Sequence, residues 1–200
     1  MSCSVLVWPW SKILLGANVN QDLWVFGYGS LMWRPGFDFE EQHLAYVQGY
    51  HRSLCVFSHV HRGTPDRPGI VLGLDRGGSC RGVAFRISAL RRFVTLEYLR
   101  AREQVTAVYR ETFLTATLDH GEKVACAAYI VDRKHHQYAG RLTETELARL
   151  ILQGHGISGK NTDYVTATNQ HLLAVGVKDP VLTRLSNLSS TSASGHITVP

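Results

Sequence analysis

The 200-residue sequence lacks the long runs that define several unusual classes of protein. It has only six prolines and no long Ser/Gly tract, which argues against extended disorder in the middle of the chain. The N-terminal apolar run is interrupted by Pro9 and Lys12, and no basic residues precede it. This segment therefore predicts neither a membrane span nor a signal peptide, and we expect no membrane partner.

Clusters of basic residues are also missing, although the formal net charge is +5 and the pI is near 9.2. Lysines and arginines are scattered, and no basic stripe alternates with aromatic residues. Both observations disfavour nucleic acid as a partner. A positive charge that is spread in this way is compatible with a small anionic substrate.

Metal-binding patterns are scarce. The four cysteines, at positions 3, 55, 80 and 126, form no CxxC pair, and lone thiols in a domain of this size indicate a reducing, cytoplasmic environment. The ten histidines include a His-x-His pair at 59–61 and an adjacent pair at 135–136, but no HExxH motif completes either of them. We therefore predict no metal ion and no cofactor.

The apolar fraction of 44% suits a single compact domain with its own core. We assign this domain to residues 22–187. It follows an N-terminal extension of unknown role, residues 1–21, and precedes residues 188–200, whose sequence LSSTSASGHITVP predicts a disordered tail. The sequence leaves the oligomeric state open.

Strand patterns dominate the first two thirds of the chain. Runs rich in β-branched and aromatic residues predict strands at 23–28, 43–59, 70–74, 82–87, 111–118 and 123–131. Turns are expected at Asp75–Gly78 and at Asp119–Gly121.

Helical patterns follow. They cover 88–105, 143–153, 161–175 and 180–187, and Thr143 with Glu146 forms a capping box at the start of the second. This order predicts an α+β fold, with a small, mostly antiparallel β-barrel or sheet, one inserted helix and C-terminal helices.

A glycine-containing loop follows the first predicted strand, in the sequence Val25-Phe26-Gly27-Tyr28-Gly29-Ser30-Leu31. Glycines at 27 and 29 permit a positive φ and let a ligand approach backbone N–H groups, as an anion or a developing oxyanion requires. The loop lacks the third glycine of a dinucleotide fingerprint, the Gly-Lys-Ser/Thr of a P-loop and the GxSxG of a nucleophile elbow. On its own, it is explained equally well as a strand-end turn packed under an aromatic ring.

A carboxylate extends the apolar face of the helix predicted at 88–105. Phe93, Leu96, Leu99 and Glu103 follow steps of three, three and four, which keep them on one face, while the arginines at 100 and 102 point elsewhere. A glutamate in apolar surroundings has a raised pKa and can act as a general base. The alternative is that Glu103 ends the stripe and pairs with an arginine.

The two features, with four further motifs in order, resemble the ChaC family of glutathione-degrading γ-glutamylcyclotransferases. The resemblance runs from about Trp24 to Leu185. It is carried by Phe26-Gly27-Tyr28-Gly29-Ser30-Leu31-Met32-Trp33, Gly49-Tyr50-His51-Arg52, His61-Arg62-Gly63-Thr64-Pro65 with Pro68-Gly69, Gly77-Gly78-Ser79-Cys80-Arg81-Gly82-Val83-Ala84, Arg102-Glu103 and Gly159-Lys160-Asn161-Thr162-Asp163-Tyr164. One departure is Ala107, which stands where family members often have glycine.

This resemblance implies a γ-glutamylcyclotransferase-like fold and a lyase that splits glutathione into 5-oxoproline and Cys-Gly. The glutamyl α-amine attacks its own γ-carbonyl, with Glu103 as general base and no cofactor. Substrate binding is implied for Val25, Phe26, Gly27, Tyr28, Gly29, Ser30 and Leu31. Arg62, Tyr109 and Tyr138 are weaker candidates, since packing or a place in a solvated loop also explains each of them.

Three alternatives stay open. The substrate could be another γ-glutamyl amine or peptide. The chain could be a non-catalytic module that binds an anion or a peptide through the Gly27–Leu31 loop. A serine hydrolase using Ser30 is disfavoured, because the sequence places no histidine to activate that hydroxyl.

Overall fold

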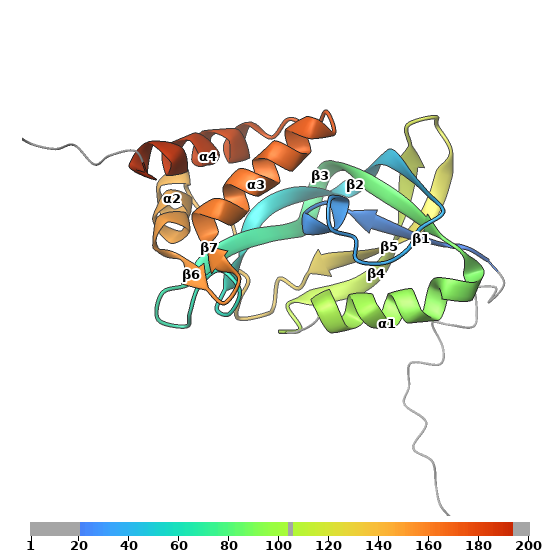
Figure 1. Cartoon of the computed structure of the whole chain (residues 1–200), viewed down its shortest axis with the longest axis horizontal. Coiled ribbons are helices and arrows are strands. Elements are labelled where there is room, and N and C mark those ends of the chain that lie inside the picture. The colour runs from blue at the N-terminus through green and yellow to red at the C-terminus, as the bar shows by residue number, and fades with distance from the viewer. Residues whose placement is uncertain (1–20, 104–105, 194–200) are drawn as a thin grey trace, which may run out of the picture.

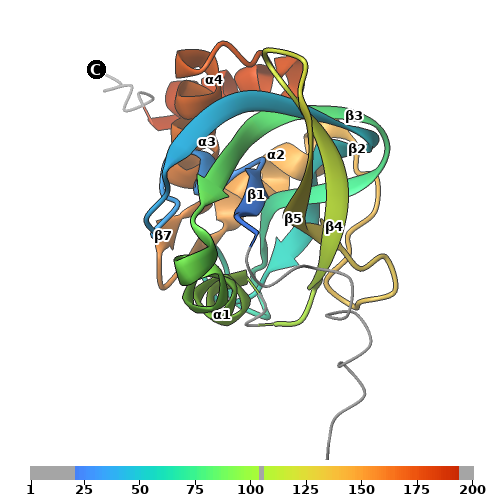
Figure 2. The same cartoon turned by 90° about the vertical axis from the view of Figure 1, so that its right-hand side faces the viewer.

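The computed structural model describes residues 21–103 and 106–193, and five strands form a closed barrel. The strands are β1 (Leu23–Gly27), β2 (Glu41–Ser58), β3 (Gly69–Ile87), β4 (Tyr109–Leu118) and β5 (Lys123–Val131). Their order around the barrel is β1-β3-β2-β4-β5, and every pair is antiparallel except β1 with β5 (Figures 1 and 2). The predicted α+β class with a mostly antiparallel barrel is therefore confirmed.

The two longest strands, β2 and β3, pair along most of their length. The predicted turn at Asp75–Gly78 is wrong, because these residues lie inside β3. Gly77 and Gly78 have φ of 103° and 68°, and they face Gly49, with φ of 82°, where the register of β2 against β3 shifts. Glycines at these left-handed positions form a bulge that bends the ribbon around the barrel, whereas a turn would have divided it into two strands.

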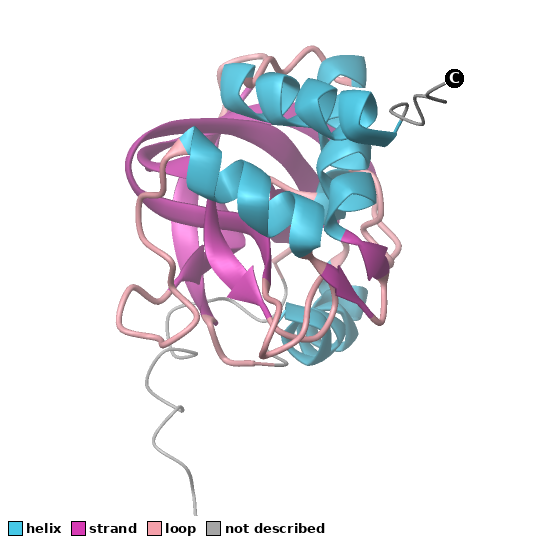
Figure 3. Ribbon diagram, turned by 90° about the vertical axis from the view of Figure 1, so that its left-hand side faces the viewer, coloured by secondary structure: helices cyan, strands magenta, loops and turns pink. Residues whose placement is uncertain are grey.

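The helices are α1 (Arg92–Glu103), α2 (Glu144–Gln153), α3 (Asn161–Ala174) and α4 (Pro180–Ala193), with 3₁₀ turns at Ser30–Met32 and Ala89–Arg91. Figures 1 and 3 show α2, α3 and α4 gathered against one side of the barrel and α1 apart from them. The two-residue strands β6 (His155–Gly156) and β7 (Gly159–Lys160) form a small separate hairpin. Among the described residues, no helix is both long and apolar enough to cross a membrane.

The first helix begins later than the sequence pattern suggests, since residues 89–91 form a 3₁₀ turn. The buried face of the helix carries Arg92, Thr95, Leu96 and Leu99, of which Leu96 and Leu99 were expected. Phe93, expected on that face, is 54% exposed. The buried residues 92, 96 and 99 are separated by steps of four and three, which keep them on one face of the helix. Phe93 follows Arg92 directly, so its side chain points away from that face.

The ends of the domain differ in part from expectation. The Thr143–Glu146 capping box is present at the start of α2, and α3 ends before Gly176, which has φ of 73°. However, α4 continues to Ala193, so the prediction of a disordered tail from residue 188 is wrong for residues 188–193. Residues 1–20 and 194–200 lie outside the described residues, and with them nearly all of the expected extension.

Candidate active site

The end of α1 and the loop after β1 meet in one pocket of about 590 Å³. Glu103, the last residue of α1, lines it together with Tyr28, Gly29, Ser30 and Leu31 of the loop. The remaining lining residues come from the loop after β1, the 58–72 segment, the end of α1, residues 106–109, β5, the turn of the small hairpin and α3. They are Arg34, Ser58, His61, Arg62, Val71, Leu72, Arg102, Thr106, Tyr109, Tyr129, Ser158 and Tyr164.

Arg102 joins the catalytic candidate to the loop. Its Nε lies 3.1 Å from Oε1 of Glu103, and its Nη2 donates a hydrogen bond of 3.1 Å to Oγ of Ser30. Its Nη1 donates to the carbonyl oxygens of Arg34 and Pro35 at 2.5 and 3.1 Å. The prediction that Arg102 points away from the site is therefore wrong, because the long side chain folds back from the helix end.

The Glu103 side chain is only 17% exposed. Burial raises the pKa of its carboxyl group, and the positive charge of Arg102 opposes this shift without cancelling it. A carboxylate with a raised pKa holds a proton more strongly than an exposed glutamate does, so it is suited to accept one from a bound ligand.

The two glycines of the loop after β1 do not have the positive φ that the sequence suggested. Neither Gly27 nor Gly29 has a positive φ. Gly27 instead leaves room for the following 3₁₀ turn, since a Cβ at this position would lie 3.1 Å from Cβ of Leu31. Val25 and Phe26 are fully buried strand residues in the barrel core and do not line the pocket, so the structure does not support binding roles for these two side chains.

Two tyrosines fix one wall of the pocket to β3. Tyr109 donates a 2.7 Å hydrogen bond to the carbonyl oxygen of Leu72, and the Tyr164 hydroxyl accepts one of 3.2 Å from the N–H of the same residue. Burial raises the pKa of Tyr164 to about 12. Both phenols are therefore protonated at neutral pH and shape the pocket without adding charge.

Arg62 lines the pocket where the 58–72 segment meets the small hairpin. Its Nη1 donates to the carbonyl oxygens of Ser158 and Lys160 at 2.6 and 3.1 Å, and its guanidinium lies 5.5 Å from the ring centroid of Tyr164. Arg34 and Arg102 also line the pocket, so its lining holds three guanidinium groups and a single carboxylate, that of Glu103. This balance favours an anionic ligand.

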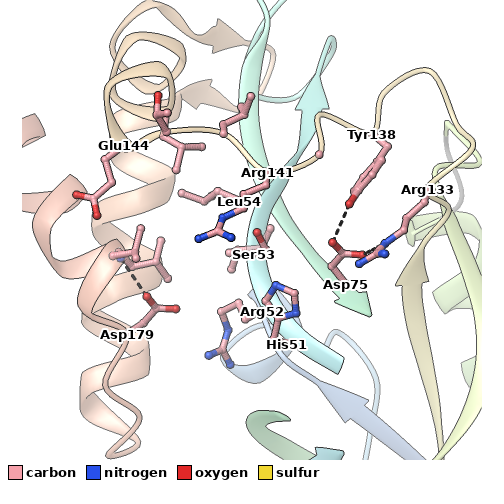
Figure 4. A pocket seen from close by; sticks show the side chains of 17 residues that line it. His51, Arg52, Ser53, Leu54, Asp75, Arg133, Tyr138, Arg141, Glu144 and Asp179 are labelled. Carbon is pink, nitrogen blue, oxygen red and sulfur yellow. Dashed lines mark hydrogen bonds and ion pairs between the residues drawn. The ribbon is translucent and has the colours of Figure 1, made fainter. Parts of the chain in front are cut away.

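A larger cavity of about 810 Å³ lies between β2, α2 and α4 (Figure 4). Tyr138 lines it and is absent from the Glu103 pocket, so the structure argues against Tyr138 as a ligand there. Burial raises the pKa of Asp75 in this cavity, but hydrogen bonds from Arg133 (2.6 Å) and Tyr138 (2.8 Å) outweigh it and lower that pKa. Asp75 is thus a fixed anion and a poor proton acceptor, which makes the smaller pocket the better catalytic candidate.

Sequence reasoning missed several functional residues. Arg102 and Tyr164, which line the pocket, and Asn161, which does not, lay within the recognised motifs but were given no role. Asn161 is buried and forms two hydrogen bonds with β3. Its Oδ1 accepts from the N–H of Ile70 at 2.6 Å, and its Nδ2 donates to the carbonyl oxygen of Ile70 at 2.9 Å. Arg34 and Tyr129 carried no signal of their own. The N–H of Arg34 bonds to the carbonyl oxygen of Ser30 at 2.9 Å, which keeps Arg34 beside the loop, and Tyr129 reaches the pocket from β5 only in the closed barrel.

Comparisons with known proteins agree on one family. The family described as ChaC-like protein matches residues 23–191. The chain is 35% identical over 163 residues to the glutathione-specific γ-glutamylcyclotransferase of Escherichia coli (strain K12), covering 82% of this chain and 71% of that protein. It is 34% identical over 173 residues to γ-glutamylcyclotransferase 2-3 of Arabidopsis thaliana, covering 82% and 87%.

The fold is also found in solved structures. A yeast γ-glutamyl cyclotransferase specific to glutathione superimposes with a TM-score of 0.79 at 23% identity, covering 90% of this chain and all of that one. At this identity the likeness concerns the fold alone.

Proposed function

Because this chain belongs to the ChaC-like protein family, we propose that it is a γ-glutamylcyclotransferase that splits glutathione into 5-oxoproline and Cys-Gly. The single observation that carries the proposal is the pocket in which a buried, proton-accepting Glu103 faces the loop after β1. The surrounding guanidinium groups suit glutathione, which carries two carboxylates and one ammonium group at neutral pH.

The first step is deprotonation. Glu103 removes a proton from the α-ammonium group of the γ-glutamyl unit, because only the free amine is nucleophilic. The amine nitrogen then attacks the γ-carbonyl carbon of the same residue and closes a five-membered ring. Since both reactants belong to one molecule, the pocket contributes mainly by holding the folded conformation, and such orientation is worth roughly 7–11 kcal/mol in favourable cases.

The second step is expulsion of the dipeptide. The tetrahedral intermediate carries a negative charge on the former carbonyl oxygen, and we assign the backbone N–H groups of Gly29, Ser30 and Leu31 as its hydrogen-bond donors. Loss of one such donor typically costs about 2.7–4 kcal/mol. The intermediate collapses by breaking the amide C–N bond, and protonated Glu103 returns its proton to the departing nitrogen. The regenerated carboxylate then takes the second proton from the ring nitrogen, which leaves the neutral lactam of 5-oxoproline. The reaction consumes no water.

The charged ends of the substrate meet different parts of the pocket in this proposal. Ser30 and Tyr28 hold the glutamyl α-carboxylate near Arg102. Arg62 faces the glycine carboxylate of the leaving dipeptide. Tyr109 packs against the substrate chain from β4.

We further infer that the enzyme acts in the cytoplasm. All three cysteines within the described residues are unpaired and buried, as in proteins of a reducing compartment. Burial raises the pKa of Cys55 and Cys126 to about 12, so neither thiol is a nucleophile at neutral pH.

The test is a mass-spectrometric assay of the purified protein with glutathione, following 5-oxoproline and Cys-Gly together. Equal release of both products supports the proposal. Parallel reactions with γ-glutamyl-alanine measure how far the activity extends to other γ-glutamyl amines. Binding of glutathione by calorimetry without either product would instead support a non-catalytic binding module.

A further inference from the structure

A group of two imidazoles and three carboxylates lies where β2 begins and the β4–β5 hairpin turns. Among the described residues, His43, Asp119 and His120 each offer a ligand atom such that all three atoms lie within 4.8 Å of one another. His43 comes from β2, and Asp119 and His120 form the turn after β4. Their side chains are 26%, 50% and 50% exposed, so an ion from solvent reaches them freely.

Two ring nitrogens converge on one carboxylate oxygen. Nδ1 of His43 and Nδ1 of His120 lie 3.4 and 3.2 Å from the same oxygen, Oδ1 of Asp119. The shorter of these contacts is a hydrogen bond. Ligands held about 2.0–2.1 Å from a tetrahedral zinc ion are separated from one another by about 3.3–3.4 Å, which is close to both separations, so an ion can replace the proton between these groups with little movement.

The opposite ring nitrogens are oriented as metal-bound histidines require. Nε2 of His43 lies 3.4 Å from Glu41, and Nε2 of His120 lies 3.2 Å from Glu122. A histidine that binds a metal through one nitrogen usually donates the other N–H to a carboxylate or carbonyl, which fixes the tautomer and orients the ring. Both histidines therefore present Nδ1 to Asp119 and Nε2 to a supporting glutamate.

We propose that His43, Asp119 and His120 form a surface site for Zn²⁺, with Glu41 and Glu122 as the carboxylates that orient the two histidines. Two nitrogens and one carboxylate oxygen make a suitable donor set for this ion, with a solvent molecule as fourth ligand. The sequence alone predicts no such site, because His43 belongs to β2 and meets the other two ligands only when the barrel closes.

The site is separate from the Glu103 pocket. Tyr109, at the start of β4, lines that pocket, whereas Asp119 directly follows the other end of the same strand. Ten residues of strand span roughly 30 Å. Figures 1 and 2 accordingly show the tip of the β4–β5 hairpin and α1 at opposite ends of the barrel. Bound Zn²⁺ therefore ties β2 to the hairpin and stabilises the fold, and it leaves turnover of the substrate unchanged.

The experiment uses the full chain, purified without a polyhistidine tag and freed of metal with a chelator. Titration calorimetry with ZnCl₂ is expected to show one equivalent bound, and the melting temperature should rise with the ion. Replacement of zinc by Co²⁺ should give the visible absorption bands of a tetrahedral cobalt site. Asp119→Asn and His120→Ala should each weaken binding by about tenfold or more, and Glu122→Gln by about tenfold.

The matched control is His136→Ala, since His136 is an exposed histidine whose ring lies near those of His59 and His135, outside this group. It should bind zinc as the unchanged protein does. The proposal is overturned if no stoichiometric binding occurs. It is equally overturned if His120→Ala and Asp119→Asn, shown to be folded by their melting curves, bind zinc as tightly as the His136→Ala control.

Discussion

Nη2 of Arg102 donates a hydrogen bond of 3.1 Å to Oγ of Ser30, while Nε of the same guanidinium lies 3.1 Å from Glu103. One side chain thus holds the loop after β1 and the carboxylate at the end of α1 at a fixed separation. Its charge also opposes the effect of burial on the pKa of Glu103. Arg102 is therefore a positioning residue whose loss should change both geometry and pH dependence.

Replacement of that guanidinium should alter the pH profile. In Arg102→Met the opposing charge is gone, so the pKa of Glu103 rises further and the acidic limb of kcat/KM moves to higher pH. The lost charged hydrogen bond, typically about 1.5–3 kcal/mol, should also lower kcat/KM about 10- to 100-fold. Arg102→Lys retains the charge and should keep the limb near its original pH. Arg110→Met, at an exposed position of β4, is the control. An unmoved acidic limb in Arg102→Met would show that Arg102 does not tune Glu103.

Glu103→Gln should abolish nearly all turnover. The amide has a similar shape but cannot accept the ammonium proton, and general-base contributions of this kind are about 10²–10⁴-fold in rate. Release of 5-oxoproline from glutathione is the measurement. Glu97→Gln, an exposed position of the same helix, should remain fully active. Normal turnover by folded Glu103→Gln would remove Glu103 from its proposed role.

The same substitution should have a pH-dependent effect on stability. Because the pKa of Glu103 is raised in the folded state, folding favours its protonated form. The stability associated with that proton is present at low pH and is lost as the pH rises through the folded-state pKa. The neutral amide avoids this loss, so Glu103→Gln should unfold at higher urea concentration than the unchanged protein at pH 7. Below pH 4 the gap should shrink, and a gap that widens there would contradict the assignment.

Ala107→Gly should stabilise the protein. Ala107 has φ of 57°, in the left-handed region that costs an alanine roughly 1–2 kcal/mol. Glycine removes this strain but loses more conformational freedom on folding, so we expect a net gain of about 0.5–1 kcal/mol in the free energy of unfolding. The matched variant Ala167→Gly, in the middle of α3, should lose about 1 kcal/mol. Urea unfolding of the two glycine variants is the measurement. If Ala107 is not strained, Ala107→Gly will lower the free energy of unfolding, as the matched variant does.

Asn161→Ala should destabilise the fold. Asn161 is fully buried, and its amide satisfies both backbone groups of Ile70, at 2.6 and 2.9 Å. Truncation leaves a buried N–H and a buried carbonyl without partners, each costing about 1–3 kcal/mol. We expect a loss of about 2–4 kcal/mol in the free energy of unfolding. Gln170→Ala, at an exposed position of α3, should change it by less than about 0.5 kcal/mol.

Local patterns in the sequence were sufficient for much of this protein. Alternating strands with turn residues predict the antiparallel barrel, and helical spacing brings Glu103 to the end of a largely buried face. The motif around Gly27 marks the loop. Each of these follows from preferences that act over a few neighbouring residues.

Contacts between distant segments were decided only by the tertiary structure. The sequence places Val25 and Phe26 beside the loop, but barrel closure buries both in the core, and it brings Tyr138 to a different cavity from Glu103. Arg102 reaches Ser30, and His43 reaches Asp119, because strands and helices far apart in the chain pack together. The physical reason is that a side chain's partners depend on how the elements are arranged in space, which no short stretch of sequence encodes.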